Sequence, residues 1–365
     1  MNWIESFRDK EIVENLLKKI EYHILPDKEY KIMEICGTHT VSISRSGLRY
    51  ILPKSVRLIS GPGCPVCVTA QGEIDAVFEL LKNNKNLTIA VYGDLIRVPG
   101  SDGKSLLDYR GNGYKVKIIH SVLDILKYAQ HSNDEIVFVS IGFETTTPQT
   151  AFLILEAFKK DINNLSILVF NKTMPEVIDV LLSDENLQID GFLCPGHVSA
   201  VTGDELYLPM VRRGKAAAIS GFEPVDVLYG ILSIIEQVNN KEFKIVNNYK
   251  RVVKGEKNKV AFELINNVFE PSDAIWRGIG LIKNSGLKIK KGYQQYDAIK
   301  RYGIKFPDYS EKKGCRCGDV LKGYITPDEC ELFGVVCTAD NPYGPCMVSS
   351  EGTCAAYYQF GGRFE

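Results

Sequence analysis

Eight short apolar runs, separated by amphipathic stretches, recur between about residue 30 and residue 220, and this pattern restricts the fold most. Most runs are continuously apolar rather than alternating, which is typical of strands buried on both faces of a parallel sheet. Helical patterns such as residues 224–238 lie between them, and this alternation indicates βαβ units and an α/β fold. The expected strands are Tyr30–Ile35, Val56–Ser60, Leu87–Tyr92, Val116–His120, Ile136–Ile141, Leu165–Phe170, Gly191–Leu193 and Ala216–Ile219.

The runs fall into two groups of four, which predicts two similar parallel-sheet α/β domains, residues 30–132 and 133–240, facing a cleft. A closed eight-stranded barrel is the alternative, but a polar loop over residues 93–114 stands where a helix should follow the third run. Past residue 240 the periodicity fades. We expect an irregular iron–sulfur domain over residues 241–365, held together by its ligands and joined by an N-terminal helix within residues 1–29.

The role that cysteines play in a protein depends on the cellular compartment in which the protein lies. The N-terminus lacks the apolar core of a signal peptide, and no apolar run approaches the roughly 18 residues of a membrane span. This predicts a cytoplasmic protein without a membrane partner, in which clustered cysteines indicate metal binding or catalysis rather than disulfide bridges. The net charge of -1 gives no basic footprint for nucleic acid.

Cys36 and His39 follow the first expected strand, at a strand-to-helix turn. A thiolate at Cys36 would be favoured by the helix dipole and by a neighbouring imidazole, so His39 is expected to orient or deprotonate Cys36, or to lend a ligand. The alternative is a buried cysteine beside a hydrogen-bonded histidine.

Cys64 and Cys67 form a CxxC motif at the start of a helix, after a Gly-Pro-Gly turn. This arrangement suits a redox dithiol, because the helix dipole activates the first thiol and the second can resolve a mixed disulfide. Half of a zinc site and inert packing are the alternatives.

In the expected second domain, Glu144 follows one strand, and Cys194 and His197 follow another. Glu144 could act as a base or orient a ligand, whereas the threonines beside it are suited to capping the next helix. Because the carboxyl ends of parallel strands form the ligand crevice, we expect these residues and Cys36 to face one cleft.

Six of the ten cysteines lie in the last 51 residues: Cys315, Cys317, Cys330, Cys337, Cys346 and Cys354. Structural zinc sites generally use paired CxxC knuckles, whereas wide spacing in a turn-rich segment fits a four-thiolate iron–sulfur cluster. The last four are the expected cluster ligands, and Cys315 and Cys317 form a substitute ligand source or a redox pair. Zinc and free thiols are the alternatives.

Six motifs in one order resemble the HypD family of hydrogenase maturation factors, over nearly the whole chain. They are ICGTHT (35–40), GPGCPVCVT (61–69), GDLIRVPG (93–100), GFETTTP (142–148), PGHVSA (195–200) and CMVSSEGTCAAYY (346–358).

The resemblance implies a cytosolic scaffold that builds the Fe(CN)2CO unit of [NiFe]-hydrogenases with a small partner, HypC, and with HypE as the cyanide donor. It further implies Cys36 as the iron-binding thiolate, Cys64 and Cys67 as the redox pair, and a [4Fe-4S] cluster in the tail. Such a protein is an assembly scaffold with redox activity rather than a conventional enzyme. The alternative function is a cluster-containing dithiol/disulfide reductase, which leaves Cys36 without a role.

Overall fold

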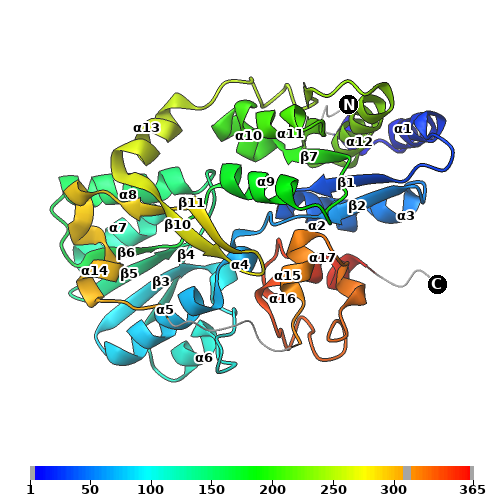
Figure 1. Cartoon of the computed structure of the whole chain (residues 1–365). Coiled ribbons are helices and arrows are strands. Elements are labelled where there is room, and N and C mark those ends of the chain that lie inside the picture. The colour runs from blue at the N-terminus through cyan, green and yellow to red at the C-terminus, as the bar shows by residue number, and fades with distance from the viewer. Residues whose placement is uncertain (1–4, 307–313, 362–365) are drawn as a thin grey trace.

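The computed structural model describes residues 5–306 and 314–361, which form two separate parallel α/β sheets and a small cysteine-rich segment (Figure 1). The β1 sheet has five strands in the order β2-β1-β7-β8-β9, and the β3 sheet has four in the order β4-β3-β5-β6. All pairings within both sheets are parallel. The expected α/β class with two parallel sheets is therefore confirmed.

The strands coincide closely with the apolar runs. They are β1 (Tyr30–Glu34), β2 (Val56–Ser60), β3 (Leu87–Tyr92), β4 (Val116–Ile119), β5 (Glu135–Ser140), β6 (Leu165–Val169), β7 (Gly191–Pro195), β8 (Ala216–Ser220), β9 (Ile245–Asn247), β10 (Phe269–Trp276) and β11 (Gly280–Ile289). Strands β7 and β8 are buried along their whole length, as expected of strands covered on both faces.

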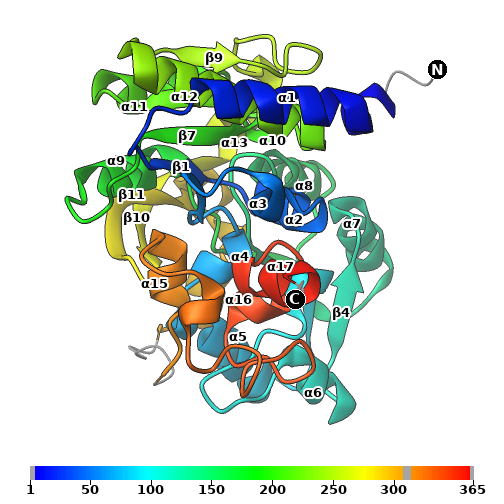
Figure 2. The ribbon, with the colours of Figure 1, turned by 90° about the vertical axis from the view of Figure 1, so that its right-hand side faces the viewer.

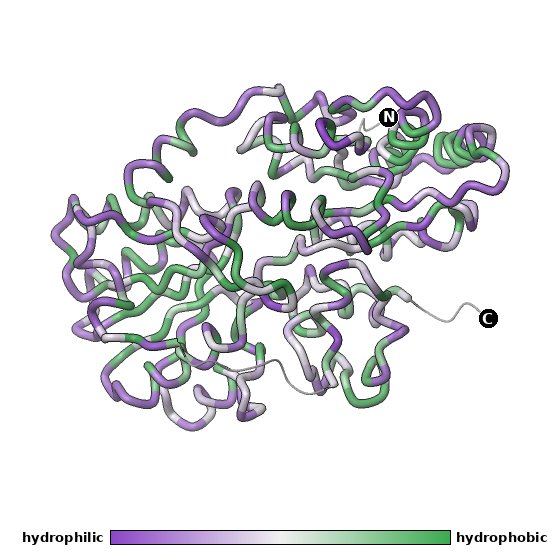
Figure 3. Tube along the Cα trace, viewed as in Figure 1, coloured by the Kyte–Doolittle hydropathy of each residue, from purple (hydrophilic) through white to green (hydrophobic). Residues whose placement is uncertain are grey.

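Helices connect the strands and cover the sheets. The α-helices are α1 (Lys10–His23), α2 (Gly37–Arg45), α3 (Leu48–Ile51), α4 (Pro65–Val68), α5 (Gln71–Asn83), α6 (Leu106–Gly111), α7 (Val122–His131), α8 (Thr147–Lys159), α9 (Met174–Ser183), α10 (Gly196–Thr202), α11 (Leu208–Arg212), α12 (Pro224–Asn240), α13 (Lys259–Val268), α14 (Ala298–Tyr302), α15 (Cys317–Lys322), α16 (Pro345–Val348) and α17 (Thr353–Phe360). Short 3-10 turns are η1 (Glu5–Arg8), η2 (Gly93–Leu95), η3 (Glu205–Tyr207), η4 (Lys291–Tyr296) and η5 (Pro327–Glu329). Apolar residues concentrate along the strands and the helix faces that cover them (Figure 3).

The sheets do not follow the expected division of the chain at residues 132 and 133. Strands β1 and β2 pair with β7, β8 and β9, whereas the chain between them forms the complete β3 sheet. The prediction that each group of four consecutive strands forms one sheet was therefore wrong. An apolar run reveals that a strand is buried, but it carries no signal for which neighbour the strand pairs with.

The N-terminal helix also packs elsewhere than expected. Helix α1 lies against α12, where Leu16 and Ile20 are buried with the apolar side chains of the β1 sheet (Figure 2). Its N-terminus is capped by Asp9, which accepts hydrogen bonds from the N–H groups of Glu11 and Ile12. The helix thus belongs to the β1 sheet and not to the cysteine-rich segment.

Residues 241–306 are more regular than the sequence indicated. Strand β9 extends the β1 sheet, and β10 and β11 form an antiparallel hairpin that reaches across the molecule to α4 and α15 (Figure 1). The cysteine-rich segment is confined to residues 314–361 of the described chain. Its short helices contact α2, α4 and β2, and so lie against the carboxyl edge of the β1 sheet.

Candidate metal and thiol site between the sheets

A cavity of about 290 Å³ lies between the two sheets, at the carboxyl ends of their strands. Cys36 and His197, which follow β1 and β7, line one side. Phe143 and Met174, which follow β5 and β6, line the other. The cleft expected between the two sheets therefore exists, and it brings Cys36 and His197 together.

Cys36 caps the N-terminus of α2 and is 4% exposed. Burial, followed by the nearby Glu351 carboxylate, raises the pKa of its thiol to about 12, although the main-chain N–H groups of His39 and Thr38 lower it. The expected activation by the helix dipole is thus outweighed by burial. At neutral pH the thiol holds its proton, which a metal ion would have to displace.

The imidazole near Cys36 belongs to His197 and not to His39. The His197 Nε2 atom lies 3.9 Å from the Cys36 Sγ atom. His39 Nε2 instead pairs with the Gly221 carbonyl oxygen at 2.9 Å, and burial lowers the pKa of His39 to about 4. His39 is not among the residues that line the cavity, and the expectation that it orients or deprotonates Cys36, or lends a ligand, stays a prediction. Phe222 lies between the two rings, with centroid distances of 4.7 Å to His39 and 5.1 Å to His197.

The CxxC turn lies beside Cys36 because of a glycine. A Cβ atom at Gly63 would collide with the backbone of Cys36, and the Gly63 carbonyl accepts a hydrogen bond from the Gly37 N–H at 3.2 Å. Cys64 and Cys67 follow at once and are joined as a disulfide with a Cα–Cα distance of 5.2 Å. Both are buried, at 3% and 0% exposure. The reversibility of this disulfide stays a prediction.

Glu144 is close to the cavity but does not line it. Its Oε1 atom accepts the Met174 N–H at 2.7 Å and so caps α9, while Oε2 is buried and has no hydrogen-bond partner among the described residues. Burial raises the pKa of Glu144 to about 7. Thr147, which the sequence suggested as a cap, donates its hydroxyl to the Phe143 carbonyl oxygen at 2.8 Å. Cys194 is fully buried within β7, and burial raises the pKa of its thiol well above the ordinary value.

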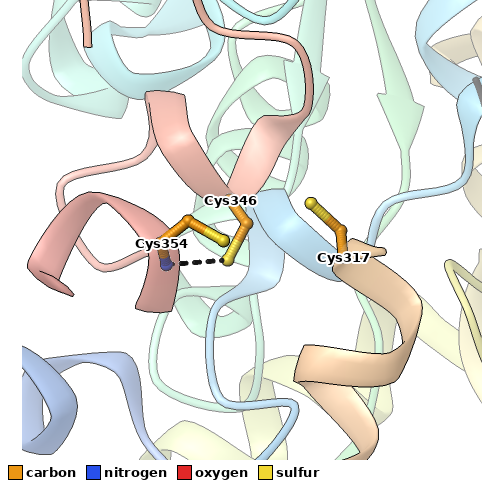
Figure 4. Close-up of side chains that lie close together, drawn as sticks. All are labelled: Cys317, Cys346 and Cys354. Carbon is orange, nitrogen blue, oxygen red and sulfur yellow. Dashed lines mark hydrogen bonds between the residues drawn. The ribbon is translucent and has the colours of Figure 1, made fainter. Parts of the chain in front are cut away.

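The cysteine-rich segment gathers its six sulfurs, but not in the expected grouping. The sulfur atoms of Cys317, Cys346 and Cys354 lie within 4.8 Å of one another (Figure 4). The Cys346 sulfur accepts the Cys354 N–H at 3.4 Å. Cys317, which the sequence placed outside the ligand set, thus joins two expected ligands.

A second cavity lies in this segment, and half of the residues that line it are cysteines. The cysteines that line it are Cys315, Cys317, Cys330, Cys337 and Cys354. Cys346 does not line this cavity, although its sulfur lies close to those of Cys317 and Cys354, and the expected ligand set stays a prediction. The wide spacing in sequence is closed by short helices and by turns such as the Phe333–Cys337 bridge.

The segment also closes the cleft. Glu351 lines the first cavity and accepts the Thr38 hydroxyl at 2.7 Å, and Ser349 and Ser350 donate to Asp94 at 3.3 and 3.0 Å. Helix α16 contacts α4, so the segment folds back onto the CxxC turn, as electron exchange between the two would require.

Sequence reasoning missed Glu351, Tyr207 and Phe222. Glu351 stands within the motif at 346–358, but a lone carboxylate among cysteines gives no sign that it faces a distant thiol. Tyr207 is fully buried in the cavity wall and lies in no motif, and its hydroxyl pairs with the Ser199 hydroxyl at 3.0 Å. Phe222 could have been found from its place at the end of an apolar run.

The fold and the site define a protein with two parallel α/β sheets, a thiol-lined cleft and a cysteine-rich closing segment. The sequence profile of HypD, described as "Hydrogenase formation hypA family", matches residues 11–361. The chain therefore belongs to the HypD family.

Similar proteins cover the chain almost completely. Hydrogenase maturation factor HypD2 of Bradyrhizobium diazoefficiens is 42% identical in an alignment 370 residues long, gaps included, that covers 99% of this chain and 97% of that protein. Hydrogenase maturation factor HypD of Cupriavidus necator is 40% identical in an alignment 374 residues long that covers 100% of this chain and 98% of that protein. A putative hydrogenase expression/formation protein of Methanocaldococcus jannaschii is 41% identical over 359 residues, covering 97% and 99%. No helix in the described part of the chain combines the length and apolarity needed to cross a bilayer.

Proposed function

We propose that this chain acts in hydrogenase maturation, as a scaffold on which the Fe(CN)2CO unit of [NiFe]-hydrogenases is assembled. The names of its relatives support the maturation role. The observation that carries the finer proposal is the Cys36 thiol, which faces His197 inside a cavity between the sheets. In this proposal the iron unit is cargo, held by the chain and then passed on.

The chemistry of the cavity suits such cargo. Low-spin iron with cyanide and carbonyl ligands binds soft, electron-rich sulfur, and Cys36 supplies it. Apolar walls such as Phe143 and Met174 keep water away from the ligands. His197 lies at the distance from which its neutral imidazole, whose pKa burial lowers, can take the proton that iron displaces from Cys36.

The cysteine-rich segment fits a [4Fe-4S] cluster in its donor set, because five cysteines line one cavity and four thiolates are needed. We propose that Cys330, Cys337 and Cys354 hold the cluster, with Cys315 or Cys317 as the fourth ligand in place of Cys346. When bound, the cluster supplies one-electron redox chemistry. The Cys64–Cys67 disulfide, against which α16 packs, is the proposed dithiol beside it.

Partners follow from the same proposal. A small chaperone, HypC, would share the iron with Cys36, and HypE would donate cyanide. Both would have to reach the cleft, which Glu351 and Thr38 border at the edge of the cysteine-rich segment.

Infrared spectroscopy of the anaerobically purified chain in complex with HypC tests the scaffold. Wild-type complex should show cyanide and carbonyl bands, and Cys36→Ala should lose them while retaining its fold. Cys194→Ala is the matched control, since Cys194 is also buried at a strand end but does not line the cavity. Bands that survive Cys36→Ala would refute the assignment.

A dithiol/disulfide reductase is the second candidate, favoured by the disulfide next to the cysteine-rich segment. It predicts turnover of a disulfide substrate that Cys64→Ser abolishes and Cys36→Ala leaves unchanged.

A further inference from the structure

The β10–β11 hairpin, which the sequence did not reveal, connects three parts of the proposed site. Its β11 strand is bonded to the chain that leads into α9: Lys172 forms an antiparallel bridge with Gly286, and the Thr173 N–H donates to the Ser285 carbonyl oxygen at 2.8 Å. Met174, the next residue, lines the cleft. The middle of β11 is thereby fixed to the wall of the cavity.

The tip of the hairpin is fixed to the chain that leaves the Cys64–Cys67 disulfide. Trp276 forms an antiparallel bridge with Thr69, and the Arg277 N–H donates to the Val68 carbonyl oxygen at 2.8 Å. The Arg277 guanidinium donates through Nε to the Thr69 carbonyl oxygen at 2.9 Å and through Nη1 to Gln71 Oε1 at 3.1 Å. Arg277 is 5% exposed, so these bonds are made away from water.

The same tip touches the cysteine-rich segment. Gly278 has a φ of 74°, and a Cβ atom placed there would collide with the Cα atom of Gly318, the residue after Cys317. The two backbones meet without side chains between them. Consecutive residues of one turn therefore hold the Cys67 end of the disulfide motif and the Cys317 end of the cysteine-rich segment.

Trp276 secures the tip from within. It is fully buried, its ring stacks on Phe143 of the cleft wall at 5.8 Å, and its indole N–H donates to the Ser285 hydroxyl at 2.8 Å. This packing keeps the Arg277–Gly278 turn rigid.

We infer that Arg277 and Gly278 are positioning residues, which clamp the cysteine-rich segment onto the Cys64–Cys67 turn and close that disulfide to thiols in solution. A disulfide that is closed to solvent can exchange electrons only with sulfur groups of the protein itself. That this exchange supplies electrons to the site rests on the proposed function. The clamp itself can be tested without the iron unit.

Gly280, the first residue of β11, offers a control next to the same turn. Its φ of 105° is at least as unfavourable for alanine as the φ of 74° at Gly278, but a Cβ atom there would have open space around it. Gly278→Ala and Gly280→Ala thus both introduce backbone strain, and only Gly278→Ala adds the collision with Gly318.

The first measurement is the rate at which dithiothreitol reduces Cys64–Cys67 in the full chain, followed by alkylation and mass spectrometry. One dithiothreitol thiolate attacks the disulfide, its second thiol displaces the protein sulfur, and the products are cyclic oxidised dithiothreitol and two cysteine thiols. Gly278→Ala should react faster than wild type on the order of tenfold, because the closed arrangement opens more often. Gly280→Ala should match wild type, and the midpoint potential should be equal in all three.

The second measurement is hydrogen exchange over residues 317–322 and 64–69, which should accelerate in Gly278→Ala alone. Equal behaviour of the two alanine variants in either measurement, or a changed midpoint potential, would overturn the clamp. If Gly278→Ala fails to fold, Arg277→Gln tests the same turn without added bulk and should accelerate both. The outcome does not depend on the infrared bands, so failure of the clamp and failure of the scaffold proposal are separable.

Discussion

The cleft places a single cysteine, Cys36, among apolar side chains and one facing imidazole, whereas residues 314–361 bring six cysteines together through short helices and turns. The cleft is built by strand ends of two sheets. In the cysteine-rich segment the buried cysteines lie beside a few apolar side chains such as Leu321 and Met347. In the proposed function, the first site would hold cargo and the second would keep a resident group.

The protonation of the cysteine thiols also differs between the cleft and the cysteine-rich segment. Burial raises the pKa of Cys36 to about 12, so its thiol is neutral until a metal ion displaces the proton. In the cysteine-rich segment, neighbouring thiols hold the pKa of Cys346 well below the ordinary value and that of Cys354 well above it. The thiols of Cys346 and Cys354 thus titrate together, whereas the Cys36 thiol stays protonated at neutral pH.

Serine substitutions in the cysteine-rich segment should have the largest effect. Cys330→Ser, Cys337→Ser and Cys354→Ser should each abolish iron binding and visible absorption in the anaerobically purified chain, because each removes a proposed cluster ligand. Cys346→Ser should retain both, since Cys346 does not line the cavity. Comparing Cys315→Ser with Cys317→Ser identifies the fourth ligand, and a Cys346→Ser protein without iron would restore the set expected from sequence.

The two histidines should separate cargo binding from stability. His197→Ala should weaken the infrared bands of the HypC complex while leaving the unfolding temperature nearly unchanged, because His197 faces Cys36. His39→Ala should lower the free energy of unfolding by roughly 2 to 4 kcal/mol, because it removes a fully buried ring and its bond to Gly221. The reverse pattern would return His39 to the role expected from sequence.

Alkylation of Cys36 should report its protonation. Since the folded-state pKa is raised to about 12, iodoacetamide should react slowly at pH 7 and about tenfold faster per pH unit up to pH 9. Glu351→Gln should accelerate the reaction at every pH in this range, because the Glu351 carboxylate raises that pKa. A rate that is independent of pH, or unchanged by Glu351→Gln, would contradict this account of the cleft.

Glu144→Gln should have the smallest effect, visible as a change in pH dependence. The folded-state pKa is raised to about 7 from 4.5, so the carboxyl group's contribution to stability is full below pH 4.5 and is lost as pH rises through 7. The loss amounts to roughly 3 kcal/mol at most, and Glu144→Gln should remove it. Urea unfolding at pH 5 and pH 8, with the exposed Glu185→Gln as control, measures the difference.

Much of the β1 and β3 sheets could be predicted from the sequence, because continuous apolar runs such as residues 136–141 and 216–219 are the direct signature of buried strands. Their partners could not, since β1 and β7 are separated by the whole β3 sheet. The hairpin was missed because the residues of β10 do not alternate regularly between buried and exposed. Its tip also depends on contacts with Thr69 and Gly318 rather than on a turn motif.

The candidate site, like the sheets, could be predicted from the sequence only in part. Cys36, His197 and the Cys64–Cys67 motif could be found because strand ends of parallel sheets converge at one edge. The choice between His39 and His197 as the imidazole beside Cys36 could not, because it depends on side-chain direction: His39, three residues along α2, points to Gly221. The grouping of the six cysteines likewise depends on turns that bring Cys317 to Cys346.

The most direct test of the central claim is anomalous diffraction at the iron edge from anaerobic crystals of the chain with HypC. The account predicts two separate iron sites, one beside Cys36 Sγ in the cleft and one within the cavity lined by Cys330, Cys337 and Cys354. The cleft signal should vanish in Cys36→Ala while the other persists. Iron found in the cysteine-rich segment alone, in crystals whose infrared spectrum carries cyanide and carbonyl bands, would contradict it.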